Sequence, residues 1–149
     1  MDPFVPKPVI MPSGSGQELA FIGVTHKLTG QQNGGGYYLF EFTFGPESGN
    51  RLHVHAHEDE VVFVIEGAIE IRLGGEKFTA QTGGVAHLPK QIPHALRNPL
   101  KTPSKYLGVA IPGGMEKFFD ALAAAEQAGK LDDRTHREIS ALYGIEWME

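Results

Sequence analysis

Short runs of apolar and β-branched residues, separated by Gly, Pro and Asn, fill most of residues 19–111. Residues 37–44 give the strongest strand signal, because aromatic side chains recur there at every second position. The apolar run at residues 61–66 predicts a strand that is buried on both sides. The pair Gly74-Gly75 predicts a hairpin between the segments that flank it. About nine short strands with closely spaced turns are typical of an all-β jelly-roll barrel.

The remaining expected elements lie at the two ends of this barrel region. The first eighteen residues carry four prolines and predict an extended arm, which is suited to packing along a partner subunit. After Pro112-Gly113-Gly114 the period changes, and Met115, Phe118 and Leu122 fall at helical spacing. We therefore expect one domain over residues 1–149, with the barrel at about 19–111. Two short helices at about 115–143 would pack on the barrel's outside or over its mouth.

Candidate chemistry is concentrated in one stretch and one later position. His53 and His55 are two residues apart on an expected strand, so their side chains point to the same face. Glu60 opens the next strand after a short turn, which brings its carboxylate back towards the same point. His94 follows a Pro-bounded turn and opens another strand. Three imidazoles and one carboxylate suit a divalent first-row metal with open coordination positions.

The spacing around these residues resembles two known motifs. His53-x-His55-x4-Glu60-x6-Gly67 is similar to the first cupin motif, and Gly83-x5-Pro89-x3-Pro93-His94-x3-Asn98 is similar to the second. Two turn positions depart from the family pattern, since Glu47 and Gln91 stand where glycine is expected. The resemblance implies a cupin-type double-stranded β-helix. Together with the C-terminal segment, it also implies a small single-domain cupin of the quercetin-dioxygenase-like kind.

Composition removes several other classes of function. The net charge of −5 and the lack of a Lys/Arg cluster argue against nucleic-acid binding. The chain has no cysteine, so a metal must be held by nitrogen and oxygen. No apolar run is long enough to span a membrane or to act as a signal peptide, and we expect a cytoplasmic protein. Phosphate-loop, dinucleotide-binding and serine-hydrolase motifs are also absent from the sequence.

The other titratable residues near the motifs receive less specific interpretations. His57 continues the phase of the histidine strand, but we place it at the turn or as a support for a neighbouring ligand. Glu58 and Asp59 are expected to be solvated turn residues. The remaining histidines are interpreted as structural or surface residues: His26, His87 and His136.

Aromatic residues are the candidates for lining a substrate pocket. Phe40, Phe42 and Phe63, with Tyr38, lie on expected strands and would suit an aromatic ligand. The alternative is that they only fill the core, as strand aromatics usually do.

These observations lead to one principal functional hypothesis and two alternatives. The principal one is a metal-dependent oxygenase for a small aromatic or enolic substrate, with one divalent metal (Fe, Mn, Ni, Co, Cu or Zn) held by His53, His55, Glu60 and His94. The resemblance implies that Glu60 is also the proton acceptor, and that the protein is a homodimer using O₂. The first alternative is an oxygen-independent isomerase, cyclase, dehydratase or decarboxylase. The second is a small-ligand-binding protein without turnover.

Overall fold

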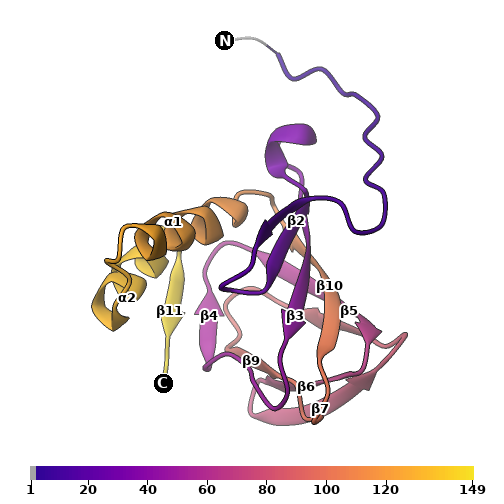
Figure 1. Ribbon diagram of the computed structural model, residues 1–149, viewed down its shortest axis with the longest axis vertical. Coiled ribbons are helices and arrows are strands. Elements are labelled where there is room, and N and C mark those ends of the chain that lie inside the picture. The colour runs from indigo at the N-terminus through magenta and orange to yellow at the C-terminus, as the bar shows by residue number, and fades with distance from the viewer. Residues whose placement is uncertain (1–2) are drawn as a thin grey trace.

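A computed structural model describes residues 3–149, and within them the chain forms eleven strands in two antiparallel sheets, with two α-helices (Figure 1). The six-stranded sheet has the order β1 (Gln17–Leu19), β2 (Val24–Leu28), β3 (Tyr38–Phe44), β10 (Ser104–Ile111), β5 (Asp59–Glu66) and β8 (Val85–Leu88). The five-stranded sheet has the order β11 (Ile145–Trp147), β4 (His53–His55), β9 (His94–Arg97), β6 (Ala68–Leu73) and β7 (Glu76–Gln81). The mostly β, two-sheet architecture confirms the expected double-stranded β-helix.

The core lies between the two sheets and is rich in aromatic side chains. On β3, Tyr38, Phe40, Phe42 and Phe44 all point inward, as their alternation predicts. β10 pairs with β3 along its whole length and places Gly108 opposite Phe40. A Cβ on this glycine would lie 2.4 Å from the Phe40 ring, so the residue must be small for the aromatic layer to pack.

The burial of β5 differs from the sequence-based expectation. Val62 and Val64 are fully buried, but Phe63 is 42% exposed and Ile65 is 38% exposed. The strand therefore alternates between a buried and an open face, and the prediction that it is buried on both sides is wrong. A continuous apolar run does not reveal whether its second face is covered, because that depends on what packs against the sheet.

Turn geometry agrees with the expected hairpin and explains two departures from the motif pattern. Gly74 and Gly75 join β6 to β7 with φ values of 58° and 86°. Glu47 (φ 57°) and Gln91 (φ 66°) also adopt the left-handed conformation that glycine favours. The turns thus keep the backbone path of the motif although the residue is not glycine, at an expected cost of about 1–2 kcal/mol each.

The C-terminal part begins with α1 (Glu116–Gln127) and α2 (Asp133–Leu142) and ends with β11. Figure 1 shows both helices and β11 gathered beside β4, on the opposite side of the barrel from β5. Met115, Phe118, Phe119 and Leu122 are buried at the helical spacing that the sequence predicts. Asp132 is the N-cap of α2, and its side chain accepts a hydrogen bond from the Thr135 amide.

Two details were not anticipated. β11 returns to the barrel and pairs with β4, which continues the five-stranded sheet by a strand that the sequence did not reveal. The segment that leads into β3 forms two short strands, β1 and β2, with a turn between them. From residue 3 the N-terminal arm is extended, as its prolines predict, and in Figure 1 it runs away from the barrel. Over residues 3–149, the helices all fall short of the length and hydropathy that crossing a bilayer requires.

Candidate metal centre and cavity

Two neighbouring strands of the five-stranded sheet bring the three motif histidines together. His53 and His94 are direct cross-strand partners on β4 and β9. His55 lies two residues along β4, so its side chain projects from the same face. The ring centroids are 4.5 Å apart for His53 and His94, and 5.3 Å apart for His55 and His94. One nitrogen from each ring lies within 4.8 Å of the others, and all three residues are buried.

The tautomer of His53 is set by the backbone. Its Nδ1 lies 2.7 Å from the carbonyl oxygen of Arg51, which can only accept a hydrogen bond. Nδ1 therefore donates, and the lone pair of the neutral ring is left on Nε2. An imidazole fixed in this way is prepared to bind a cation.

Glu60 reaches the histidines from the opposite sheet. It lies on β5, opposite Ala110 of β10 and Leu88 of β8. Its Oε1 is 3.1 Å from Nε2 of His55, and its Oε2 is 4.0 Å from Nε2 of His94. Like the histidines, it is almost completely buried. The structure thus brings together all four residues that the two motifs predict.

Burial separates the proton affinities of these groups. Burial, together with the neighbouring imidazoles, lowers the pKa of His53 to about 4 and that of His94 to about 2. Burial also raises the pKa of Glu60. For His55, burial opposes the charged form, but the Glu60 and Glu58 carboxylates outweigh it and raise the pKa. His53 and His94 are therefore neutral near pH 7, whereas His55 and Glu60 each hold a proton more tightly than the free group does.

Glu58 is placed differently from the expectation. It is 7% exposed, and its Oε2 lies 3.6 Å from Nδ1 of His55. The prediction of a solvated turn residue is therefore wrong for Glu58, which supports the ring of His55 from behind. Asp59 is also not free in solvent, because its Oδ1 accepts a hydrogen bond from the Lys90 amide.

The other histidines divide into surface and buried positions. His57 is exposed at the bend after β4, which confirms its interpretation as a turn residue. His87 is exposed on β8. His26, which had no evident partner in the sequence, is buried and makes hydrogen bonds through Nδ1 to Tyr38 and through Nε2 to Asp120. These bonds tie α1 to the six-stranded sheet.

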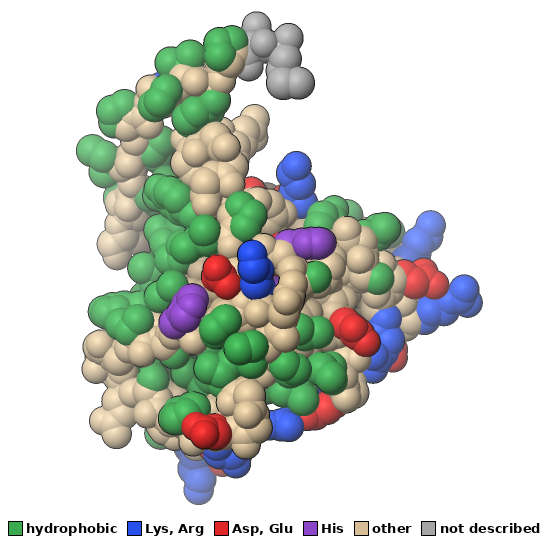
Figure 2. Space-filling model, turned by 180° about the vertical axis from the view of Figure 1, so that it is seen from behind, with side chains coloured by type: hydrophobic (Ala, Val, Ile, Leu, Met, Phe, Trp, Pro, Cys, Tyr) green, Lys and Arg blue, Asp and Glu red, His purple; other side chains and the backbone are tan. Residues whose placement is uncertain are grey.

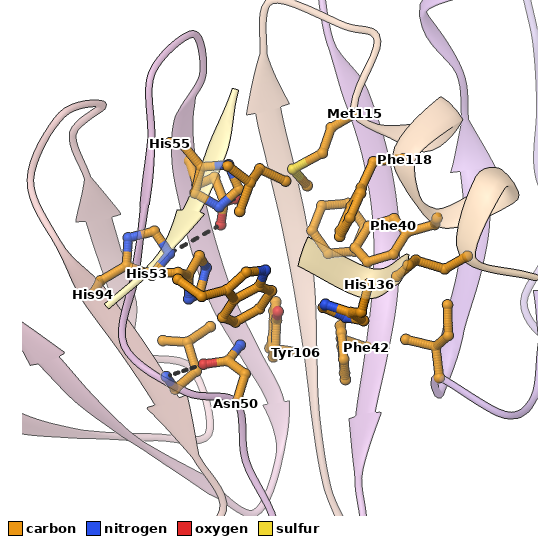
Figure 3. A pocket seen from close by; sticks show the side chains of 17 residues that line it. Phe40, Phe42, Asn50, His53, His55, His94, Tyr106, Met115, Phe118 and His136 are labelled. Carbon is orange, nitrogen blue, oxygen red and sulfur yellow. Dashed lines mark hydrogen bonds and ion pairs between the residues drawn. The ribbon is translucent and has the colours of Figure 1, made fainter. Parts of the chain in front are cut away.

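A cavity of about 160 Å³ opens beside the histidine cluster (Figure 3). Its walls are mostly apolar and come from both sheets and α1. They include Phe40, Phe42, Tyr106, Met115, Phe118 and Phe119. Tyr106 stacks on Phe42 with ring planes 7° apart, and burial raises the pKa of its hydroxyl, which stays protonated. The histidines and Glu60 therefore form the polar end of an otherwise apolar chamber.

Two of the four expected pocket residues line this cavity and two do not. Phe40 and Phe42 are part of its wall. Tyr38 is fully buried in the core, where it stacks on Phe40 and binds His26. Phe63 is on the outward face of β5, so the expectation that it lines the pocket is wrong.

The cavity residues that sequence reasoning missed include Asn50, His136 and Trp147. Trp147 lies opposite His53 because β11 pairs with β4, and the ring centroids are 4.7 Å apart. His136 reaches the cavity from α2, although the sequence suggested a polar helix face. No local pattern could identify either residue, since both depend on the return of the C-terminal segment to the barrel.

The donor set fits a divalent transition metal. The three imidazole nitrogens converge, two of the rings are neutral, and an oxygen donor stands beside them. Nitrogen and oxygen ligands of this kind are accepted by Fe, Mn, Ni, Co, Cu and Zn.

Known proteins with similar sequences indicate the same fold. The family described as "Cupin domain" matches residues 40–110. The chain is 28% identical over 118 residues to "Quercetin 2,3-dioxygenase" of Bacillus subtilis, an alignment that covers 77% of this chain and 34% of that protein. The chain spans about a third to a half of the length of the curated relatives that it matches.

Solved structures agree at the level of the fold. KdgF from Halomonas sp. superposes with a TM-score of 0.63 at 17% identity, covering 74% of this chain and 99% of that one. A predicted oxalate decarboxylase from Thermotoga maritima superposes with a TM-score of 0.56 at 21% identity, covering 60% and 78%. With the two-sheet barrel and the buried histidine cluster, these similarities lead to one conclusion: residues 40–110 of the chain form a cupin domain.

Proposed function

We propose that this protein is a metal-dependent oxygenase that acts on a small aromatic or enolic substrate. One observation carries the proposal: three buried histidines and a carboxylate converge at the polar end of a cavity whose walls are aromatic and apolar. The similarity to a quercetin 2,3-dioxygenase supports the same class of reaction.

The proposed ligands are His53, His55 and His94 with Glu60 as the oxygen donor. One divalent ion per chain, when bound, supplies Lewis acidity toward an ionised substrate oxygen and holds that substrate beside dioxygen. Glu58 stabilises the orientation of His55, and the carbonyl of Arg51 does the same for His53.

Glu60 is the residue proposed to move the proton. Its pKa is raised by burial, and it lies 3.1 Å from the Nε2 of His55, with which it can share a proton. A carboxylate at this position accepts the proton of a phenolic or enolic hydroxyl as the substrate enters the cavity. The proton passes to an oxygen of Glu60, and the substrate oxygen is left negatively charged beside the three imidazoles.

The apolar walls perform a second task. Phe40, Phe42 and Phe118 exclude water from the polar end and offer ring faces to a planar substrate. Tyr106 stays protonated, so it can donate a hydrogen bond but does not compete with Glu60 as a base.

Oxygen uptake by the metal-loaded protein tests this function. The substrates would be phenols, enols and flavonols of graded size, with Glu60→Gln as the matched variant. We expect oxygen consumption with at least one substrate and a loss of roughly 10²–10⁴-fold in the variant, whose amide cannot take up the proton. Background uptake with the whole series would overturn the oxygenase.

The same assay separates the two alternatives. The shared proton of His55 and Glu60 would also serve a lyase or isomerase that moves protons without oxygen. Turnover that continues unchanged under strict anaerobic conditions would select that class. Saturable binding with no product after long incubation would select a binding protein.

We also propose that the protein forms a homodimer. The outward face of the six-stranded sheet is apolar where Phe63 pairs with Val85 on one side and Leu107 on the other. The N-terminal arm carries further exposed apolar side chains: Phe4, Val5, Val9 and Ile10. Figure 2 shows hydrophobic side chains along this arm. A second copy would cover both surfaces, since contiguous apolar patches of this kind mark interaction sites.

A further inference from the structure

His136 stands apart from the proposed ligand set but lines the same cavity (Figure 3). It lies in the first half of α2, and the Asp132 cap positions the start of that helix. Its Nδ1 is buried and makes no hydrogen bond with any group in the described part of the chain. Buried polar nitrogens are nearly always hydrogen-bonded, so an unpartnered one at a cavity wall indicates a missing ligand.

The surroundings of His136 keep its ring neutral. Burial lowers its pKa, and the positive charges of Arg51 and Arg137 lower it further, against the opposing effect of Asp133. A neutral imidazole has one donor and one acceptor nitrogen, so it can hydrogen-bond to a hydroxyl in either direction.

Trp147 defines the distance between His136 and the histidine cluster. Its ring centroid is 4.7 Å from that of His53 and 5.1 Å from that of His136. The indole thus stands between the two, and in Figure 3 the three clustered histidines and His136 lie at different sides of the cavity. A ligand that lies along Trp147 needs the length of about one ring to reach from the cluster to His136.

The cavity volume indicates a ligand of the same size, about one ring. At about 160 Å³ it is close to the cavity of about 150 Å³ that binds benzene in an engineered protein. It is well below the range of about 300–1,000 Å³ that is usual for drug-sized ligands. A flavonol has three rings and is too large for a cavity of about 160 Å³.

We propose that the substrate has a single ring, or an enol of similar size, and that His136 hydrogen-bonds to a polar group on the side remote from the metal. The ionisable oxygen lies at the histidine cluster, the ring packs between Trp147 and the wall formed by Phe42 and Phe118, and the second polar group meets the imidazole. This rests on the proposed function for the metal end only. His136 is then a specificity-determining residue and takes no part in proton transfer.

The fluorescence of Trp147 provides the test, because it is the only tryptophan of the chain and lies in the cavity wall. Zinc-loaded protein would be titrated, without oxygen, with catechol and with 4-(hydroxymethyl)catechol, whose extra hydroxyl lies remote from the chelating pair. The decisive quantity is the dissociation constant of catechol divided by that of 4-(hydroxymethyl)catechol. We expect His136→Phe to reduce this ratio by roughly three- to tenfold, with catechol binding itself little changed.

Two variants control for side effects. His136→Gln keeps a donor and an acceptor and should restore part of the preference. His57→Phe makes the same chemical change at an exposed turn and should leave the ratio unchanged. A ratio that is the same in His136→Phe as in the unaltered protein would overturn the proposal, and so would quercetin binding as tightly as catechol.

A metal-free arm distinguishes this inference from the proposed function. Toluene and benzyl alcohol differ by one hydroxyl and need no metal. We expect the ratio of the dissociation constants of toluene and benzyl alcohol to depend on His136 in the same way, even if the protein holds no zinc. If the protein holds no zinc, only the metal proposal fails. The absence of saturable binding by any of these single-ring probes overturns the inference.

Discussion

Glu58 and His55 face each other in the barrel interior, with Oε2 of Glu58 3.6 Å from Nδ1 of His55. Within residues 3–149 neither atom makes a hydrogen bond, and both are shielded from solvent. A small approach of the two side chains would form a charge-assisted hydrogen bond, which would direct Nε2 of His55 towards the cluster. The carboxylate of a turn residue is thereby coupled to the metal centre.

This relationship predicts that Glu58→Gln weakens metal binding without removing it. The amide keeps the size of the side chain but loses the charge that raises the basicity of His55. We expect an affinity loss of roughly 10–100-fold, measured by competition with a chromophoric chelator. Glu66→Gln, at an exposed strand end, is the matched control. Equal affinities in both variants would show that Glu58 plays no part in the centre.

His94→Ala should abolish stoichiometric metal binding, because it removes one of three convergent nitrogens. Elemental analysis of protein purified without an affinity tag is the measurement. We expect about one transition metal ion per chain in the unaltered protein and in His87→Ala, whose ring is exposed on β8. Retention of metal in His94→Ala, or its absence from the unaltered protein after reconstitution, would contradict the site.

Asp132 gives a prediction about pH. Its pKa is lowered because the carboxylate accepts a hydrogen bond from the amide of Thr135 at the start of α2. A group whose pKa is lowered in the folded state stabilises the fold at pH values above its unfolded pKa, here near 3.8. That contribution is lost as the pH falls through the folded pKa. The stability difference between the unaltered protein and Asp132→Ala should therefore be largest near neutral pH and shrink below pH 4.

Thermal melting at several pH values would measure this difference. Asp132→Asn is the control, because asparagine also caps helices but does not titrate. It should stay close to the unaltered protein near pH 7 and keep its advantage over Asp132→Ala in acid. A difference between aspartate and alanine that is independent of pH would show that the carboxylate charge contributes nothing to the cap.

The outward face of β5 predicts the effect of a charge at Phe63. Phe63→Glu places a carboxylate in the apolar patch and should convert a dimer to a monomer, as measured by sedimentation or light scattering. Leu142→Glu is the control, because Leu142 is 80% exposed on α2, away from that sheet. A monomeric unaltered protein, or a dimer that survives Phe63→Glu, would remove the proposed interface.

Gln91 predicts a gain in stability. Its φ of 66° is unfavourable for a side chain, whereas glycine adopts it readily. Gln91→Gly should raise the free energy of unfolding by up to about 1 kcal/mol, after the entropy that glycine loses on folding is subtracted. Gln81→Gly, within β7, should instead destabilise. Denaturant unfolding of the two variants would reveal the opposite signs.

Sequence patterns alone predicted the barrel, the hairpin at Gly74-Gly75, the two helices and the motif residues His53, His55, Glu60 and His94. These features depend on spacing over a few residues, where strand and helix periods set the relative directions of side chains. What covers each face of these elements depends on tertiary packing. It buries Glu58, exposes Phe63, and brings Trp147 and His136 into the cavity through the return of the C-terminal segment. The pairing that places Trp147 beside His53 joins residues 94 positions apart, and no local period encodes it.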